Sequence, residues 1–375
     1  MRLFGLPVLG RLDRWILRSF VLAYVVAAVS LLVLFVVFDM SAKVEELAAG
    51  DEGSTGQLAR LAWYYLLVLP DLHHQAAPFV SLGAGLYTAA RVVGSREWIA
   101  VVMAGVPSAR LFLPVVVAGA VFASATSLVR EEASAAFGHW RAEVSRSLDP
   151  ESAERDAEDV WLRTRQGSVV FVGRSHLDEE GALEPRLEAV EAPVRMDGGW
   201  GILRAAEARY RVGQDDTAGT WHLTDGTLRH LDDAGGLVAA PVETHPALDF
   251  EPRDVLLAMR ARAEPQSLSG GEAERLLERD RDSAVLRTVV EAHRAAPFMD
   301  VLFLLMALPF AIRTTRPALL RGILQAVVLC CTGFVVNYFL RSLGMQGDID
   351  PKLAAWIPVG VIALVGGVLF LRQKT

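Results

Sequence analysis

The 375-residue chain contains little cysteine and almost no lysine. Its two cysteines, Cys330 and Cys331, are neighbours within an apolar run, which excludes the disulfide scaffold of a small secreted domain. Only three of the 37 basic residues are lysines, and 44 acidic residues give a formal charge of −7. This balance excludes a protein that coats nucleic acid, so we expect no nucleic-acid partner.

The sequence also lacks the short motifs of common catalytic chemistry. It contains no Gly-x4-Gly-Lys-Ser/Thr phosphate loop, no His-Glu-x-x-His, no Gly-x-Ser-x-Gly and no Cys-x-x-Cys. Five of the eight histidines are isolated, at positions 139, 176, 222, 230 and 245. We therefore predict that the chain is not an enzyme and uses no metal or cofactor.

Long apolar runs are present, and hydrophobic residues make up 52% of the chain. A membrane-spanning helix needs about 20 apolar residues. Six stretches meet this requirement: residues 20–38, 58–90, 111–129, 295–312, 323–340 and 353–371. The first has no small-residue cleavage site, which favours an uncleaved helix over a signal peptide. The second is too long for one straight span, so we predict a long tilted helix with kinks at Pro70 and Pro78.

Charges between the spans predict their orientation. Segments 1–19, 91–110, 313–321 and 372–375 hold twelve basic residues and two acidic ones, whereas segment 39–57 holds one lysine and five acidic residues. Basic residues collect in cytoplasmic loops. Both termini are therefore predicted to be cytoplasmic.

A polar segment, residues 130–294, separates the third span from the fourth and is predicted to lie outside the cytoplasm. Its start, up to residue 159, is rich in Ala, Glu and Arg and is expected to continue the third span as a helix. Short alternating runs then predict strands at 160–172, 187–196, 201–212 and 221–231. Such spacing indicates an all-β sandwich, an open barrel or a jelly roll.

Two helices are expected after these strands, at 249–262 and 269–287. Ser269 and Glu272 have the spacing of a capping box, in which each residue's side chain accepts a hydrogen bond from the other's backbone N–H. The charges of the second helix are interpreted as a solvated face leading back to the membrane.

Ionisable residues interrupt the second apolar stretch at Asp71, His73 and His74. Such groups are costly at membrane depth and often functional. A kinked helix end near the interface also tolerates them. Three interpretations stay open: an interfacial structural position, a contact to substrate or proton, and a metal site. Asp300 in the fourth span is interpreted as a polar contact within the bundle.

The loop after the second span contains a short amphipathic helix pattern. Ser95 is a suitable N-cap, Glu97 lies in the first turn, and Gly105 ends the pattern. Trp98, Val101 and Val102 can share one side with Gly105 at a spacing of three to four residues. This helix either lies on the membrane surface or docks into a cytoplasmic partner with Glu97 as the charged contact, and the spacing does not separate the two.

Several short motifs follow one another along the chain. They are Leu12-Asp-Arg-Trp-Ile16; Pro70, Pro78, Glu97 and Gly105 in one ungapped spacing; Val290-Glu-Ala-His-Arg-x-x-Pro297; Leu308-Pro-Phe-Ala with Arg313 and Arg316; and Leu343-Gly344 with Asp350-Pro-Lys-Leu-Ala-Ala-Trp-Ile-Pro358. The whole chain resembles the LptF/LptG permeases of lipopolysaccharide export in these motifs, in the order of the motifs and in the six predicted spans. The motif at the N-terminal end is closer to the LptG type.

The resemblance implies a membrane α-helical bundle of six transmembrane helices with an inserted periplasmic all-β jellyroll-like domain. Residues 1–129 would hold transmembrane helices one to three, with a coupling helix at about 95–105. Residues 130–294 would form the periplasmic domain with its flanking helices, and residues 295–375 transmembrane helices four to six. The implied location is the bacterial inner membrane.

The resemblance also implies a function and partners. The chain would be a permease subunit of an ABC-type transporter that extracts lipopolysaccharide and passes it to a periplasmic β-jellyroll bridge. Its partners would be an LptF/LptG-type permease in a heterodimer, a cytoplasmic LptB-type ATPase dimer that hydrolyses ATP, and an LptC-type bridge protein. Contact with the ATPase would use the coupling helix, through Ser95, Arg96, Glu97, Trp98, Val101 and Gly105.

Basic residues near the outer ends of the spans are the candidates for lipid phosphates. Family members of the LptG type carry lysines at the outer end of the first span, where this sequence has Lys43 as its one base. Arg141 matches a basic position of the family, and Arg60 and Arg341 lie near the same interface in the predicted topology. For each of the four, an interfacial anchor is the alternative.

Two other functions stay open at the level of sequence. One is a membrane-anchored receptor or assembly factor that uses its outer β domain. The other is an exporter of the same fold for a different glycolipid.

Overall fold

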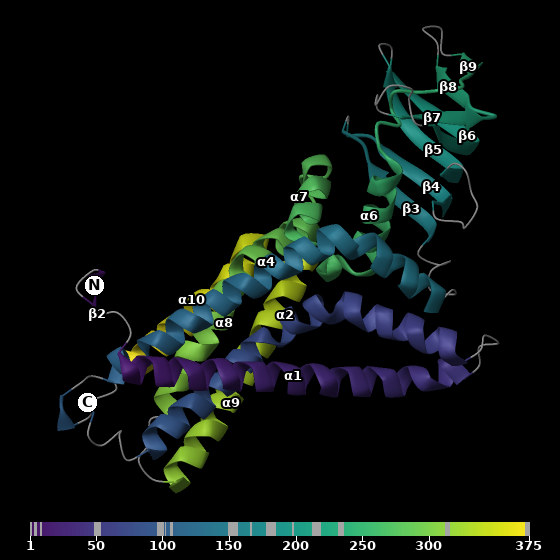
Figure 1. Cartoon of the computed structure of the whole chain (residues 1–375). Coiled ribbons are helices and arrows are strands. Elements are labelled where there is room, and N and C mark those ends of the chain that lie inside the picture. The colour runs from purple at the N-terminus through teal and green to yellow at the C-terminus, as the bar shows by residue number, and fades with distance from the viewer. Residues whose placement is uncertain are drawn as a thin grey trace. The chain divides into compact units, whose positions relative to one another are not determined.

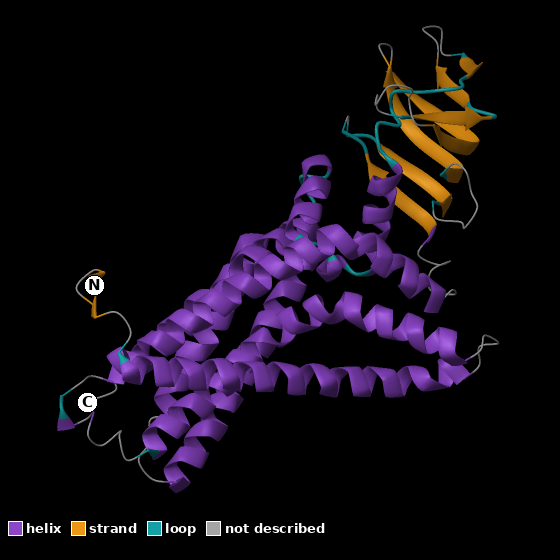
Figure 2. Cartoon of the chain, in the orientation of Figure 1, coloured by secondary structure: helices purple, strands orange, loops and turns teal. Residues whose placement is uncertain are grey.

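The computed structural model of the chain is shown in Figure 1. It describes all residues except 1, 4–5, 8–9, 49–53, 96–100, 102, 106–107, 149–156, 166, 178–184, 197–198, 212–218, 232–235, 312–315 and 372–375. Two compact units are present: residues 1–136 with 290–375, and residues 137–289. We call them the membrane unit and the β unit. Long helices build the first, and most of the strands lie in the second (Figure 2).

Six long helices run through the membrane unit, two of them continuing from or into the β unit. They are α1 (Arg11–Ala48), α2 (Ser54–Gly94), α4 (Ser108–Leu148), α8 (Ala284–Ala311), α9 (Arg316–Gln346) and α10 (Pro351–Leu371). Each contains a stretch long and apolar enough to cross a membrane, which confirms the six predicted spans. A two-residue hairpin, β1 (Arg2–Leu3) with β2 (Leu6–Pro7), precedes α1.

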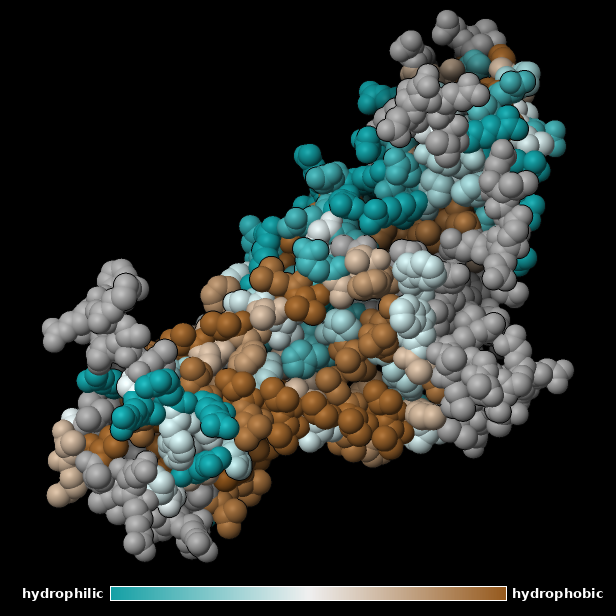
Figure 3. Space-filling model, viewed as in Figure 1, coloured by the Kyte–Doolittle hydropathy of each residue, from teal (hydrophilic) through white to brown (hydrophobic). Residues whose placement is uncertain are grey.

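The helices differ in how much apolar surface they expose. In their most apolar stretches, most residues of α2 and α8 are buried within the unit, whereas few residues of α1 and α9 are. On α1, Leu22, Val33 and Phe38 each expose more than half of their surface. Hydrophobic side chains accordingly gather over α1 in Figure 3. An apolar face of this length is unfavourable in water and is typical of a helix in contact with lipid or another apolar surface.

Close packing in the membrane unit depends on two glycines. The side chain of Leu304 on α8 is fully buried between Gly85 of α2 and Gly119 of α4. A Cβ atom at either glycine would lie 2.3 Å from a methyl carbon of Leu304. Small residues allow membrane helices to approach closely. The three helices therefore meet around one leucine.

The β unit contains one antiparallel sheet of seven strands in the described residues. The strands are β3 (Glu158–Arg163), β4 (Val169–His176), β5 (Arg186–Met196), β6 (Gly199–Arg211), β7 (Thr220–Thr224), β8 (Thr227–Leu231) and β9 (Leu237–Pro241). Their order is β3-β4-β5-β6-β8-β9, and β7 also pairs with β6. This confirms a β domain inserted between membrane helices.

Strands β7 and β8 lie end to end and pair with consecutive parts of β6. β7 pairs with residues 207–211 and β8 with residues 201–204 in a single continuous register. The break lies at Asp225 and Gly226, where Asp225 adopts a φ of 54°. This Asp-Gly pair, a dipeptide typical of turns, divides the stretch predicted as a strand at 221–231 into two strands.

On the buried face of the sheet, Trp221 of β7 joins an apolar cluster that includes the helix α6 (Pro252–Ala263). Trp221 is 1% exposed, and its Nε1–H donates a hydrogen bond to the carbonyl of Phe250 at 2.6 Å. Val255 of α6 joins the same apolar cluster. The indole thus fills the core while its one polar atom is satisfied.

A short 3-10 helix (Pro265–Ser267) leads from α6 to α7 (Gly270–Arg279). The capping box at the start of α7 is confirmed. The Oγ atom of Ser269 accepts a hydrogen bond from the N–H of Glu272 at 3.1 Å, and the Glu272 carboxylate accepts one from the N–H of Ser269 at 2.9 Å.

The prediction of one helix over 269–287 is wrong, because α7 ends at Arg279 and α8 begins at Ala284. Asp280 instead accepts a hydrogen bond from Arg163 of β3 at 2.7 Å. Ser283 then caps α8, because its Oγ atom accepts the N–H of Leu286 at 3.3 Å. A tertiary ion pair and a local cap together end one helix and start the next.

Candidate functional site

Charged side chains from different helices are buried within the membrane unit. Asp71 of α2, Arg130 of α4 and Asp300 of α8 are 8%, 6% and 3% exposed. Such residues are rare in membrane-spanning helices and mark contacts between helices or functional sites. Together with His293 of α8 and Arg341 of α9, these residues form what we call the buried polar cluster.

Arg130 lies at the centre of this cluster. Its Nε atom is 2.9 Å from Oδ1 of Asp71, in an ion pair whose side chains are both nearly buried. Its Nη1 atom is hydrogen-bonded to Nε2 of His293. One guanidinium group therefore connects α2, α4 and α8.

Arg341 is the predicted lipid-binding residue whose side chain the structure describes. Its Nη2 atom donates a hydrogen bond to the carbonyl of Ala292 on α8 at 3.2 Å. Nε of Arg341, Oδ1 of Asn337 and Oδ2 of Asp300 are buried and have no hydrogen-bond partner within the described part of the chain. Asn337 and Arg341 are four residues apart and share a face of α9. Unpartnered buried polar atoms are costly, so this region favours water or a polar ligand.

The two neighbouring histidines of α2 have different surroundings. Nε2 of His73 lies 3.4 Å from the hydroxyl of Tyr24 on α1. Nδ1 of His74 is buried without a hydrogen-bond partner among the described residues. Within those residues, no three His, Cys, Asp or Glu side chains come together in a way that could hold a metal ion.

Both predicted kink residues, Pro70 and Pro78, lie inside α2. Pro70 directly precedes Asp71 of the buried polar cluster. Proline cannot donate the backbone hydrogen bond of a regular helix and therefore weakens the ladder at this point. The kinks themselves stay a prediction.

The predicted coupling helix is described in part. Arg96, Glu97 and Trp98 lie outside the described residues, whereas Ser95, Val101 and Gly105 lie within them. The Ser95 hydroxyl donates a hydrogen bond to the carbonyl of Val92 at 2.8 Å, and so it closes the end of α2. Gly105 adopts a φ of 71°, which favours glycine, at the point where the pattern was expected to end.

The other predicted lipid-binding residues lie in three different helices. Lys43 belongs to α1, Arg60 to α2 and Arg141 to α4, and their side chains are outside the described part of the structure. Sequence reasoning missed Arg130 and His293. It treated the first as the start of the polar segment and the second as part of a motif. The available indication was that Asp71, within the second apolar stretch, and Arg130, just after the third, carry opposite charges.

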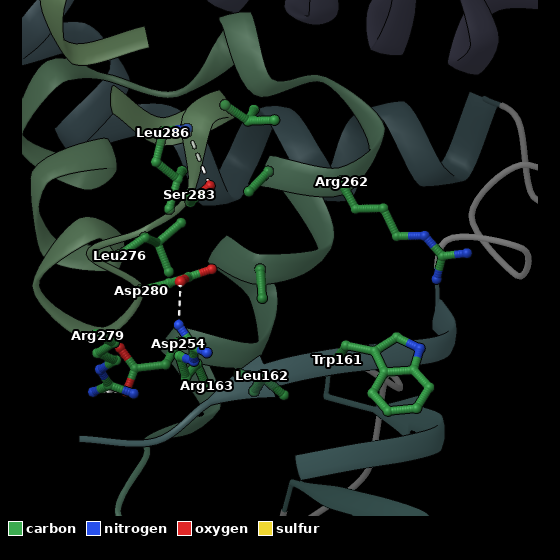
Figure 4. Close-up of a pocket in the computed structure, with 13 residues that line it drawn as sticks. Trp161, Leu162, Arg163, Asp254, Arg262, Leu276, Arg279, Asp280, Ser283 and Leu286 are labelled. Atoms are coloured by element: carbon green, nitrogen blue, oxygen red, sulfur yellow. Dashed lines mark hydrogen bonds and ion pairs between the residues drawn. The ribbon is translucent and has the colours of Figure 1, made fainter. Parts of the chain in front are cut away.

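The β unit contains a cavity of about 240 Å³ between β3, α6, α7 and the first residues of α8 (Figure 4). Ion pairs line one side of it: Arg163 with Asp280 and Arg279 with Asp254, both at 2.7 Å. The charges on this wall are thus already paired.

Arg262 lies at the other side of this cavity, near Trp161 (Figure 4). Its Nη1 atom donates hydrogen bonds to the carbonyls of Glu158 and Asp159 at 3.2 and 2.6 Å. These carbonyls belong to β3, an edge strand of the sheet. Arg262 therefore covers part of this edge, which is a common protection against unwanted strand pairing.

The opposite edge strand, β9, is more exposed. Among the described strands it pairs with β8 alone. Leu237 of β9 is opposite Leu231 of β8 in the register, and these side chains are 71% and 63% exposed. Trp200 on β6 is 66% exposed as well. This end of the sheet thus combines a free strand edge with exposed apolar side chains.

Glu207 and His245 of the β unit have lowered pKa values. Hydrogen bonds from Arg209 hold the pKa of Glu207 below its usual value. Burial lowers the pKa of His245, whose Nδ1 atom accepts the N–H of Ala247 at 3.0 Å. In both cases the form favoured by the fold is the deprotonated one.

Six apolar helices, a buried polar cluster and an inserted antiparallel sheet define a multi-pass membrane protein with a β domain. The family model of the lipopolysaccharide export system permease LptF/LptG matches residues 14–372. The chain therefore belongs to this family of transporter permeases. The match does not distinguish LptF from LptG. No curated protein matches the chain significantly.

Proposed function

We propose that the chain is the LptG-type permease of an ABC transporter that extracts lipopolysaccharide from the inner membrane of a bacterium. The family match over residues 14–372 carries this proposal. The motif Leu12–Ile16 favours LptG over LptF. In the proposed topology both termini are cytoplasmic, and residues 130–294 lie in the periplasm. The partner permease is of the LptF/LptG type, and the two form a heterodimer.

The energy for transport comes from ATP hydrolysis by a separate LptB-type ATPase dimer that docks on residues 95–105. The sequence has no phosphate loop, so ATP must be hydrolysed by another chain. The loop between α2 and α4 carries basic residues typical of the cytoplasmic side. Its ends are well defined, by the hydrogen bond that closes α2 at Ser95 and by the left-handed turn at Gly105. Glu97 is the proposed charged contact.

An LptC-type bridge protein receives the lipid at the β unit. Its docking site is the edge of β9, because Arg262 covers part of the other edge strand. Strand addition at a free edge gives main-chain hydrogen bonds, and exposed side chains such as Leu237 and Leu231 add apolar contact.

The lipid phosphates bind basic residues near the outer ends of the spans. Arg341 is the best supported of these, because its Nε atom is buried and has no hydrogen-bond partner among the described residues. Lys43, Arg60 and Arg141 complete the proposed set. The low number of lysines near the first span supports a second candidate, a permease that exports a related glycolipid.

Co-purification tests the transporter function directly. The tagged chain is purified in detergent as wild type, as Glu97→Ala and as Glu46→Ala, and the accompanying ATPase activity is measured. We expect an ATPase to co-purify with the wild type and to be reduced about tenfold by Glu97→Ala, which corresponds to about 1.4 kcal/mol of docking free energy.

Glu46→Ala is the matched control, because it removes an acidic residue from the segment predicted on the opposite side of the membrane. We expect it to retain the wild-type activity. Absence of an ATPase from the wild-type preparation, or equal activity in Glu97→Ala, would contradict the proposed coupling. The β unit as a receptor domain would then be the better hypothesis.

A further inference from the structure

The contact between Arg130 and His293 defines the chemical state of the histidine. A guanidinium group has five N–H donors and no acceptor. Nε2 of His293, which is hydrogen-bonded to Nη1 of Arg130, must therefore be the acceptor. An imidazole with an acceptor nitrogen is neutral and carries its proton on Nδ1. The arrangement thus requires the neutral form of His293.

Protonation removes this acceptor. A protonated imidazole has two N–H donors and a positive charge. It cannot accept from Arg130, and it repels the guanidinium across a partly buried contact where screening is reduced. The ion pair of Arg130 with Asp71 does not need His293, so it can persist. Proton uptake by His293 would therefore break the polar contact between α8 and α4, whereas the ion pair between α4 and α2 would stay.

Most of the charged groups around His293 are engaged in contacts of their own. Asp71 and His74 of α2, Arg130 of α4 and Arg341 of α9 lie within electrostatic range of the cluster. Asp71 is already paired with Arg130, and Arg341 donates to the carbonyl of Ala292, the residue before His293. On α8 itself, Glu291 is paired with Arg294 at 3.1 Å and accepts from Trp356 of α10 at 3.0 Å.

Several buried polar atoms in this part of the bundle need a hydrogen-bond partner such as water. Nδ1 of His73, Nδ1 of His74 and Nε of Arg341 are buried without hydrogen-bond partners among the described residues. Bound water commonly fills such sites in proteins. Water bound at these atoms would give the imidazole of His293 a source of protons within the membrane unit.

We propose that His293 is a positioning residue for transport: in its neutral form it holds α8 on the Asp71–Arg130 pair, and proton uptake breaks this contact and shifts α8. Imidazole is the side chain whose ordinary titration lies between pH 5 and 8. The effect on transport rests on the proposed function, whereas the effect on helix position does not.

Helix position is measured by spin-label distances in the purified full-length chain. Val129 on α4 and Phe298 on α8 are exposed and lie close in sequence to Arg130 and His293. Both are replaced by Cys and labelled, after Cys330 and Cys331 have been replaced by Ala. In the wild-type background we expect the distance distribution to change between pH 8 and pH 5.5.

Two substitutions separate the proposal from a general effect of pH. His293→Gln retains an acceptor oxygen for Arg130 but does not titrate, so we expect the pH 8 distribution at both pH values. His293→Leu provides no acceptor, so we expect the released distribution at both. His222→Gln removes a histidine of β7, outside this contact, and should retain the wild-type response. A wild-type chain without a pH response, or a response retained in His293→Gln, overturns the proposal.

A second readout links the contact to transport. The pH profile of the co-purified ATPase is compared between the wild type and His293→Gln, and we expect a flatter profile for the variant with a similar maximum. A profile with the wild-type shape would overturn the role in transport. If no ATPase co-purifies, the proposed function fails, and the spin-label distances still decide the helix contact. Thermal unfolding of both variants establishes that they are folded.

Discussion

At the scale of single residues, the buried ion pair of Arg130 with Asp71 adds little to the stability of the fold. The desolvation of two charges offsets most of their attraction, so such a pair adds little net stability compared with a well-packed apolar pair. Removal of one partner, however, costs about 3–5 kcal/mol because the other charge stays buried. The contact of Arg130 with Asp71 and His293 is therefore better suited to defining helix positions than to holding the fold together.

A pH-dependent stability is predicted for the β unit from His245. Burial lowers the pKa of His245 below its usual 6.5, so the folded state favours the neutral imidazole. Its contribution to stability is complete above the unfolded pKa of about 6.5 and is lost as the pH falls. His245→Asn retains an acceptor for the N–H of Ala247, as in an Asx turn, and does not titrate.

We expect the wild-type β unit to lose more stability between pH 7.5 and pH 5.5 than the His245→Asn variant. The full-length chain is unfolded in urea, and unfolding of the β unit is monitored by its susceptibility to a protease. The free energy of unfolding at the two pH values gives this difference. His222→Gln, a substitution on β7, serves as the control and should retain the wild-type dependence. Equal losses in the wild type and in His245→Asn would contradict the prediction.

At the scale of elements, the packing of α2, α4 and α8 around Leu304 illustrates how small residues determine helix contact. Gly119→Ala places a methyl group 2.3 Å from a methyl carbon of Leu304. Overpacking of this kind costs about 1–3 kcal/mol. Leu304→Ala alone leaves a cavity and costs about 2–5 kcal/mol. We expect the double variant to be more stable than the sum of the two effects predicts, because the substitutions share one contact.

Thermal unfolding of the four proteins in detergent tests this coupling. Gly83→Ala is the matched control, because a Cβ atom at Gly83 meets no atom within 4 Å. It should be neutral or slightly stabilising, since alanine is the better helix former. Additive effects of Gly119→Ala and Leu304→Ala would show that the three helices do not meet around this leucine.

The secondary structure of the β unit was largely predictable for a physical reason. Alternating residues of β5 and β6 reflect a sheet with one buried face, and the Asp225–Gly226 pair marks the break between β7 and β8. The break between α7 and α8 was not predictable. It depends on the contact of Asp280 with Arg163, which is more than a hundred residues away along the chain.

At the scale of the whole molecule, the charges between the six spans predict which segments face outwards. Single cysteines at Thr55, Glu180 and Met345 should react with a membrane-impermeant reagent added outside the inner membrane. Lys374→Cys should not react until the membrane is opened. Cys330 and Cys331 are first replaced by Ala. Labelling of the first three from the cytoplasmic side alone would overturn the proposed topology.

The sequence by itself determined the six apolar spans, the inserted β domain, most of its strands and the family resemblance. These depend on local patterns, because apolar length and alternation are properties of consecutive residues. The tertiary structure decided which charges meet. Asp71, Arg130 and His293 are far apart along the chain, and only the packing of α2, α4 and α8 brings them into one cluster. The same packing brings Leu304 into close contact with Gly85 and Gly119. The sequence alone does not distinguish these three residues from many similar ones.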